Sequence, residues 1–253
     1  MGRSTRWREI WERRSVTPEQ VDHTMVSLAD LIAADGFDTG FGDITAEAWT
    51  DFVARTCATF DLVAGDSLFE VGCGAGAFLY LPYLAGISVG GADYSAALVD
   101  TAKRAMPDGT FLVQDANAID VGEQVDVILA FSVFHYFDGL DYARSVLGRM
   151  CAKARRGVAI LDVPDAASAD DALAYRHELT GGAEKYAERY AGLEHQSYDR
   201  DWMREALEGF GMVDVRIESQ SIEDYRNGQY RFNAYGSQPG AVTAGRMNGS
   251  ARN

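Results

Sequence analysis

Between residues 66 and 164, short apolar segments alternate with amphipathic ones, and this alternation constrains the fold more than any other feature of the sequence. Five segments have the length and composition of buried strands: SLFEV, ISVGGA, TFLV, VDVILAF and GVAILDV. Helical periodicity is clear in two connecting segments, SAALVDTAKRAM and LDYARSVLGRMCAKA. Because connections of this length make neighbouring strands run parallel, we predict an α/β fold on a mostly parallel sheet.

A glycine-rich turn follows the first of these strands. The sequence FEVGCGAGAF places Gly72, Gly74 and Gly76 where the strand gives way to a helix. Glycine lets a ligand approach the backbone, and the helix N-terminus offers N–H groups to it. The string also fits the dinucleotide fingerprint GxGxxG/A, so the glycines alone do not separate a nicotinamide cofactor from another nucleoside. Glu70 favours a ligand with an ammonium group, since a carboxylate beside a pyrophosphate is badly placed.

Acidic residues also follow the next two strands. Asp93 comes about twenty residues after the glycines, where a carboxylate can accept both hydrogen bonds from a ribose diol. Asp115 follows the third strand and can accept from an adenine amino group, while the Ala116 N–H can donate to a ring nitrogen. Because ligands of open α/β sheets bind at the carboxyl edge, we expect Glu70, Asp93 and Asp115 to lie in one row there.

The segments EVGCGAG, GADYS, QDAN and AFSVFHYF resemble, in order and spacing, the successive motifs of class I S-adenosylmethionine-dependent methyltransferases. The resemblance covers roughly residues 66–162. It implies a Rossmann-like sheet of seven strands, mostly parallel with an antiparallel last strand, and S-adenosylmethionine as the cofactor. The implied cofactor residues are Glu70, Gly72, Gly74, Gly76, Asp93, Tyr94, Asp115, Ala116 and Phe131.

The remaining segments predict additions to this core. We expect an N-terminal helical cap (1–62), a cofactor-binding half (63–164), a lid insertion after the fifth strand (165–198), a C-terminal helix and hairpin (199–238) and a disordered tail (239–253). The predicted hairpin consists of VDVRIES and QYRFNAY. The lid is polar and rich in tyrosine.

The methyl acceptor is expected beyond the fourth strand and beneath the lid. In-line displacement at a sulfonium needs alignment and exclusion of water, plus a base where the acceptor loses a proton. His135 and His195 are candidate bases, although each is also read as a packed, hydrogen-bonded histidine. The further candidates are Tyr198 as a catalytic residue and, around the substrate, Phe134, Tyr136, Tyr190 and two possible anion clamps, Arg226 and Arg231.

Composition excludes several classes of function. The net charge of −15 disfavours nucleic acid, which needs a basic face, and no apolar run is long enough for a membrane helix. Three cysteines without a CxxC pair and four histidines without HxxxH spacing indicate neither disulfides nor a metal site. The charged N-terminus lacks a secretory signal, so we expect a cytoplasmic protein; a homodimer is one option for its assembly.

The resulting interpretation is methyl transfer from S-adenosylmethionine to oxygen, nitrogen or carbon of a small organic acceptor, in the style of bacterial specialised metabolism. One alternative is C-methylation of a small prenyl diphosphate through a carbocation, with aromatic side chains around the cation and arginines on the diphosphate. Two alternatives come from other classes: an NAD(P)-dependent oxidoreductase and a non-catalytic protein that binds a nucleoside cofactor.

Overall fold

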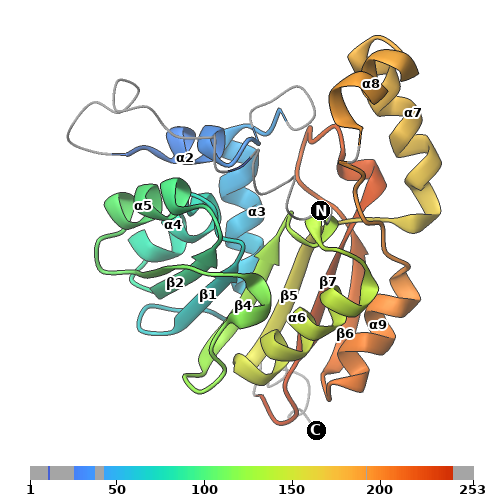
Figure 1. The fold of residues 1–253 in the computed structure, drawn as a ribbon. Helices are drawn as coiled ribbons and strands as arrows, with labels where there is room; N and C mark the ends of the chain where they lie inside the picture. The colour runs from blue at the N-terminus through green and yellow to red at the C-terminus, as the bar shows by residue number, and fades with distance from the viewer. Residues whose placement is uncertain (1–10, 12–25, 38–42, 192, 242–253) are drawn as a thin grey trace, which may run out of the picture.

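A seven-stranded sheet runs through the computed structural model, which describes residues 11, 26–37, 43–191 and 193–241 (Figure 1). Its strand order is β3-β2-β1-β4-β5-β7-β6. The strands are β1 (Ser67–Val71), β2 (Ser88–Asp93), β3 (Thr110–Val113), β4 (Val125–Phe131), β5 (Ala154–Pro164), β6 (Val213–Ser219) and β7 (Arg231–Ser237).

Strand direction in the sheet agrees with the predicted fold class. The pairs β1–β2, β1–β4, β2–β3 and β4–β5 are parallel, whereas β7 pairs antiparallel with both β5 and β6. Because the chain order reverses beside β1, the strands leave a crevice at their carboxyl ends, where open α/β sheets bind ligands. The prediction of a Rossmann-like, mostly parallel sheet with an antiparallel last strand is confirmed.

Helices cover both faces of the sheet. Alternate side chains of β4 show the two layers, because Val127 and Leu129 pack with the helices from α2 to α5 while Ile128 and Ala130 pack with α6 and α9. Burial on both faces explains why β4 reads as a continuous apolar run. The helices are α2 (Leu28–Ala34), α3 (Ala46–Thr59), α4 (Ala77–Leu84), α5 (Ala96–Ala105), α6 (Leu140–Lys153), α7 (Ala169–Thr180), α8 (Ala183–Tyr190) and α9 (Arg200–Gly209).

The C-terminal hairpin differs from the sequence pattern at one end. The segment QYRFNAY predicts a strand from residue 229, but Gly228–Tyr230 forms a 3-10 turn and β7 begins at Arg231. The turn is closed by hydrogen bonds from the Gly228 N–H to the Tyr225 carbonyl at 2.9 Å and from the Tyr230 N–H to the Asn227 carbonyl at 3.0 Å. This local closure uses backbone groups that a longer strand would need for its ladder.

The additions to the core are helical. Helices α2 and α3 lie in the segment expected to form the cap, and α7 and α8 follow directly after the carboxyl end of β5, where Figure 1 shows them standing clear of the sheet. An isolated bridge between Asp165 and Tyr198 closes the base of this lid. Residues 12–25 and 242–253, which include part of the expected cap and most of the expected tail, lie outside the described residues.

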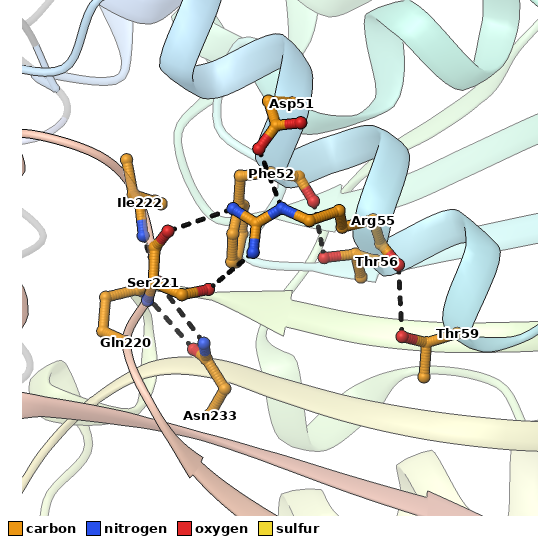
Figure 2. Close-up of polar contacts among 9 residues, drawn as sticks. All are labelled: Asp51, Phe52, Arg55, Thr56, Thr59, Gln220, Ser221, Ile222 and Asn233. Carbon is orange, nitrogen blue, oxygen red and sulfur yellow. Dashed lines mark hydrogen bonds and ion pairs between the residues drawn. The ribbon is translucent and has the colours of Figure 1, made fainter.

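Arg55 on α3 links the helical cap to the loop between β6 and β7 (Figure 2). Its guanidinium donates to the hydroxyl of Ser221 at 2.9 Å and to the Ser221 carbonyl at 3.0 Å. Next to Ser221, Gln220 exchanges hydrogen bonds with Asn233 of β7. The cap is therefore joined to polar side chains at the carboxyl edge of the sheet.

No helix within the described residues is long and apolar enough to cross a membrane. Across the same part of the chain, histidine, cysteine and carboxylate side chains form no cluster that could hold a metal ion.

Candidate functional site

The glycine turn lies at the carboxyl end of β1 and requires glycine for two reasons. Gly72 and Gly74 have φ angles of +71° and +51°, in the left-handed region that side chains disfavour. A Cβ on Gly72 would lie 2.4 Å from Val133 Cγ2, and one on Gly74 would lie 2.2 Å from Asp35 Oδ1. Both glycines line a cavity, so this tight turn forms part of its wall.

Asp93 at the end of β2 holds this turn in place. Its Oδ2 accepts a hydrogen bond from the Gly74 N–H at 3.0 Å, and its Oδ1 accepts from the Ser95 N–H at 2.8 Å. Ser95 caps α5, with its hydroxyl accepting from the Leu98 N–H. Asp93 therefore ties the glycine turn to the next helix while its side chain also lines the cavity.

Asp115 has a similar place after β3. It caps the 3-10 turn Ala116–Ala118, accepts from the Asn117 N–H at 2.9 Å and accepts a hydrogen bond from the Tyr142 hydroxyl. Asp115, Ala116 and Tyr142 all line the same cavity as Asp93. The three carboxylates of the expected row thus face one cavity.

Glu70 is the buried member of this row. Its side chain is buried, and its Oε2 has no hydrogen-bond partner within the described residues. Burial, with the nearby Asp35 and Asp93 charges, raises the pKa of the Glu70 carboxyl well above its ordinary value. A buried carboxylate oxygen without a donor fits a cationic ligand, so this residue suits the ammonium group of S-adenosylmethionine.

Asp35 is a site residue that sequence reasoning missed. It ends α2, and its carboxylate accepts hydrogen bonds from the Ala75 N–H at 2.6 Å and the Ala77 N–H at 3.1 Å. These N–H groups lie at the start of α4, where a helix favours negative charge. A weak signal was the glycine-rich loop DGFDTGFGDIT, which begins with this aspartate.

Aromatic rings form the wall between the cap and the sheet. The Phe131 ring lies edge-on to the Trp49 ring, with centroids 4.9 Å apart, and Phe37 stacks on Trp49 at 5.1 Å. Trp49 is fully buried and donates its indole N–H to the Ala77 carbonyl at 3.1 Å. Phe131, Phe37 and Trp49 line the cavity, and their electron-rich faces suit a sulfonium cation.

Most of the predicted cofactor residues reach this cavity. The lining includes Glu70, Gly72, Gly74, Asp93, Tyr94, Asp115, Ala116 and Phe131, together with Tyr136 from the predicted acceptor set. Gly76 is not in the lining; a Cβ there would lie 2.4 Å from Met106 Cε, so this glycine serves the close packing of the turn on α5.

A buried polar network adjoins the cavity beyond β4. Ser132, which lines the cavity, donates its hydroxyl to Asp162 Oδ2 at 2.7 Å. The same oxygen accepts from the Tyr225 hydroxyl at 3.1 Å and lies 3.8 Å from Arg231 Nη1. Burial and the Asp162 charge raise the pKa of the Tyr225 hydroxyl. This network places charged and phenolic groups where a methyl acceptor is expected.

Both candidate histidines lie beside Tyr136, whose ring lines the cavity, although neither histidine is itself part of that lining. The ring centroids of His135 and His195 are 4.4 Å apart, and both rings contact Tyr136. Burial, then the neighbouring His195 and Arg231 charges, lowers the pKa of His135 well below its ordinary value. Arg231 Nη1 lies 3.4 Å from His135 Nδ1, so this ring nitrogen faces a guanidinium donor.

Several residues that were predicted to bind the methyl acceptor or act on it lie elsewhere in the structure. Tyr198 is fully buried and donates its hydroxyl to the Phe134 carbonyl at 2.7 Å, which gives it a structural contact instead of the expected catalytic one. Phe134 is likewise buried in the core. Arg226 is exposed and pairs with Asp43 at 3.1 Å.

The two arginines expected to clamp an anion do not act together, because each is engaged with its own carboxylate. Arg231 is buried and engaged with Asp162, whereas Arg226 is paired with a different carboxylate on the surface. Tyr190, half-buried at the end of α8, packs its ring against Tyr186 with centroids 4.9 Å apart. Arg226, Arg231 and Tyr190 are therefore not among the described residues that line the cavity.

Comparison with known proteins adds to this geometry. Residues 69–158 match a family described as a methyltransferase domain. A search of curated protein sequences gave no match. The matched segment contains the glycine turn, Asp93, Asp115 and the fourth strand, which form much of the cavity wall.

Solved structures with this fold include several methyltransferases. Magnesium protoporphyrin IX methyltransferase from Synechocystis PCC 6803, with bound S-adenosylmethionine, is 16% identical with a TM-score of 0.60, covering 94% of this chain and 98% of that one. DesVI from Streptomyces venezuelae is 13% identical with a TM-score of 0.58, covering 84% and 99%. A TehB-like S-adenosylmethionine-dependent methyltransferase from Corynebacterium glutamicum is 16% identical with a TM-score of 0.53, covering 93% and 97%.

The seven-stranded sheet is the one expected from the resemblance, and the glycine turn and the row of carboxylates lie at its carboxyl edge. With the family match, they confirm the predicted class: the chain contains the methyltransferase domain of an S-adenosylmethionine-dependent enzyme. The cofactor expected from the resemblance is confirmed with the class, and the interpretation as an NAD(P)-dependent oxidoreductase is set aside.

Proposed function

We propose that this enzyme transfers the methyl group of S-adenosylmethionine to an oxygen or nitrogen of a small organic acceptor. The observation that carries the proposal is the two-part site: a cavity lined by the carboxylates of Glu70, Asp93 and Asp115 and, beside Ser132 and Tyr136, a buried polar network with two histidines. The first part suits a cationic nucleoside cofactor, and the second suits an acceptor that must be oriented and deprotonated.

Within the first part, each carboxylate has its own assignment. Glu70 is assigned to the ammonium group, Asp93 to the ribose and Asp115 to the adenine end, in the order in which the strands follow one another across the sheet. The cofactor supplies an electrophilic methyl group. The residues of the chain orient it, and the buried aromatic wall of Phe37, Trp49 and Phe131 excludes water and stabilises positive charge.

His195 is the better assignment for a general base. His135 is fully buried, its pKa is depressed and its Nδ1 faces Arg231, so it suits the orientation of neighbouring groups. His195 is only half-buried and contacts both His135 and Tyr136, and the Tyr136 ring lines the cavity. An imidazole in this place can take a proton from an acceptor as the methyl group is transferred.

The prenyl diphosphate alternative receives less support. It requires two arginines free to hold a diphosphate, but Arg226 pairs with Asp43 and Arg231 with Asp162. The tyrosines expected around a carbocation are also separated, because Tyr198 is in the core and Tyr190 is on α8 beside Tyr186. We therefore assign the enzyme to proton-coupled methylation.

Transfer of label tests the acceptor class. The enzyme is incubated with methyl-labelled S-adenosylmethionine and, in parallel, with the small-molecule, protein and nucleic-acid fractions of a bacterial extract. We expect enzyme-dependent label in the small-molecule fraction alone, and His195→Ala should lower its rate at least about tenfold without changing the affinity for S-adenosylhomocysteine. Label in a macromolecular fraction, or label in none, contradicts the proposal.

A further inference from the structure

Four nitrogen-bearing side chains gather beside the cavity: Arg176, Arg231, His135 and His195. Arg231 approaches His135 at 3.4 Å, the two histidine rings are neighbours, and the charge of Arg231 acts on Arg176. In a chain with a net charge of −15, such a gathering of basic groups is unexpected. The balance of charges within this group of side chains indicates the charge of the ligand that would bind there.

The carboxylate nearest this cluster is already engaged. Asp162 has no exposed side-chain surface, and its Oδ2 accepts from Ser132 and Tyr225 and lies 3.8 Å from Arg231. The Arg231 Nη1 also donates to the Asp162 carbonyl at 3.2 Å. The single negative charge of Asp162 therefore offsets the charge of Arg231, and no other carboxylate of the described ranges is paired with Arg176.

Arg176 lies on α7 of the lid between Tyr175, whose ring is 5.7 Å from that of Tyr230, and His177, whose ring is 5.0 Å from that of Tyr186. Because Tyr230 directly precedes Arg231 in the chain, this turn of α7 stands beside the cluster. Within the described residues, no carboxylate forms an ion pair with Arg176 at 4 Å or less, and its side-chain partner is the hydroxyl of Tyr186 on α8. The side chain is half-buried, and burial followed by the Arg231 charge lowers its pKa. A second charge held near Arg231 without an anion costs free energy, which a bound anion would recover.

The cluster also lies beside the place where the methyl group is expected. Tyr136 lines the cofactor cavity, and its ring centroid is 3.9 Å from that of His135 and 5.7 Å from that of His195. On the other side, the charges of Arg231 and Arg176 both act on His135. A small molecule that reaches from Tyr136 to Arg176 would pass the two histidines.

We propose that Arg176 binds an anionic group, a carboxylate or a phosphate, carried by the methyl acceptor. The inference rests on the proposed function and deepens it by naming the chemical class of the acceptor. A guanidinium offers two parallel N–H donors to either anion, and the lid position lets Arg176 close over an acceptor after it enters. The two histidines would then face the part of the acceptor that lies between its acid group and the cofactor.

Matched pairs of small probes test this assignment without knowledge of the natural acceptor. Protein saturated with S-adenosylhomocysteine is titrated with benzoate and benzamide, and with phenyl phosphate and phenol, while NMR records the dissociation constants. We expect each anion to bind at least about tenfold more tightly than its neutral partner. The tighter of the two anions distinguishes a carboxylate acceptor from a phosphate acceptor.

Two substitutions at Arg176 and one matched control complete the test. Arg176→Gln should weaken the preferred anion about 10-fold to 100-fold, and Arg176→Lys should retain part of the preference. Arg189→Gln, which removes an exposed arginine from α8 of the same lid, should leave the preference unchanged. Unchanged melting temperature and S-adenosylhomocysteine affinity show that the Arg176 variants remain folded.

Equal binding of anions and neutral partners, or an undiminished preference in Arg176→Gln, would overturn the inference. Both outcomes leave cofactor binding intact and so differ from a failure of the proposed function. That failure would appear in the wild-type protein, as absent binding of S-adenosylhomocysteine or absent transfer of label to small molecules.

Discussion

The Asp35 carboxylate accepts a hydrogen bond from the backbone N–H of Ala75 at 2.6 Å, although forty residues separate the two in sequence. A second bond to the Ala77 N–H, at 3.1 Å, places the carboxylate across the start of α4. The helical cap is thus fastened to the turn that forms the cofactor cavity. Movement of α2 and the shape of this turn are therefore coupled.

Removal of the Asp35 carboxylate should weaken cofactor binding. Asp35→Ala leaves two N–H groups without their charged acceptor, which costs about 1.5–3 kcal/mol and loosens the turn. We expect S-adenosylhomocysteine to bind about tenfold more weakly by calorimetry, with a smaller loss in Asp35→Asn. Asp51→Ala, which breaks an exposed ion pair with Arg55 on α3, is the control; an equal loss in that variant would contradict the assignment.

Gly74 should not tolerate alanine. Its φ is +51°, and the new Cβ would lie 2.2 Å from Asp35 Oδ1, an atom already fixed by the Ala75 N–H. We expect Gly74→Ala to weaken S-adenosylhomocysteine binding by about 100-fold or more, because strain and displacement of Asp35 add.

Gly65→Ala provides the matched comparison for this substitution. Gly65 has a φ of +93° but no atom within 4 Å of the added Cβ. It should cost about 1 kcal/mol of stability and leave cofactor affinity unchanged. If Gly74→Ala bound the cofactor as well as Gly65→Ala does, the turn would not be the binding element.

Glu70 should make stability depend on pH in a specific direction. In the folded protein its pKa is raised above the ordinary value of about 4.5, so the folded state holds a proton that the unfolded state releases above that pH. Its contribution to stability is full below about pH 4.5 and is lost as the pH rises through the folded pKa. Glu70→Gln removes the ionisable group, so the variant does not lose this contribution to stability as the pH rises.

Urea unfolding at pH 5 and pH 8 measures the effect of that substitution. We expect Glu70→Gln to gain stability relative to wild type as the pH rises between these values, and to bind S-adenosylhomocysteine more weakly at both. A difference between variant and wild type that is the same at both pH values would show that Glu70 does not titrate as described.

Tyr198 should contribute to stability and not to the reaction. Its hydroxyl donates to the Phe134 carbonyl in the core, so Tyr198→Phe leaves one buried acceptor unpaired. We expect a loss of about 1 kcal/mol in the free energy of unfolding with an unchanged kcat. A large fall in kcat with unchanged stability would return Tyr198 to the catalytic role that the sequence indicated.

The parts of the fold that follow from local pattern were predictable. The buried strand VDVILAF and the capped helix after Ser95 are readable because burial and capping act on neighbouring residues. Asp93 and Asp115 were also predictable, since the carboxyl end of each parallel strand must reach the same edge.

Contacts between distant segments were not predictable. Asp35 meets Ala75 only after α2 packs on α4, and Arg176 comes near Arg231 only after α7 of the lid packs against the turn that leads into β7. For the same reason, sequence reasoning assigned Arg226 and Arg231 to a shared anion, whereas folding gives each its own carboxylate. The part of the site that is expected to bind the methyl acceptor depends mainly on contacts between distant segments.

Calorimetric titration with S-adenosylhomocysteine tests the central claim most directly. We expect one molecule to bind each wild-type chain, and we expect Asp93→Ala to lose this binding, because the side chain both lines the cavity and holds the Gly74 N–H. NADH, titrated in parallel, should not bind. Wild-type affinity in Asp93→Ala, or binding of NADH in place of S-adenosylhomocysteine, would contradict the assignment of this cavity to the methyl donor.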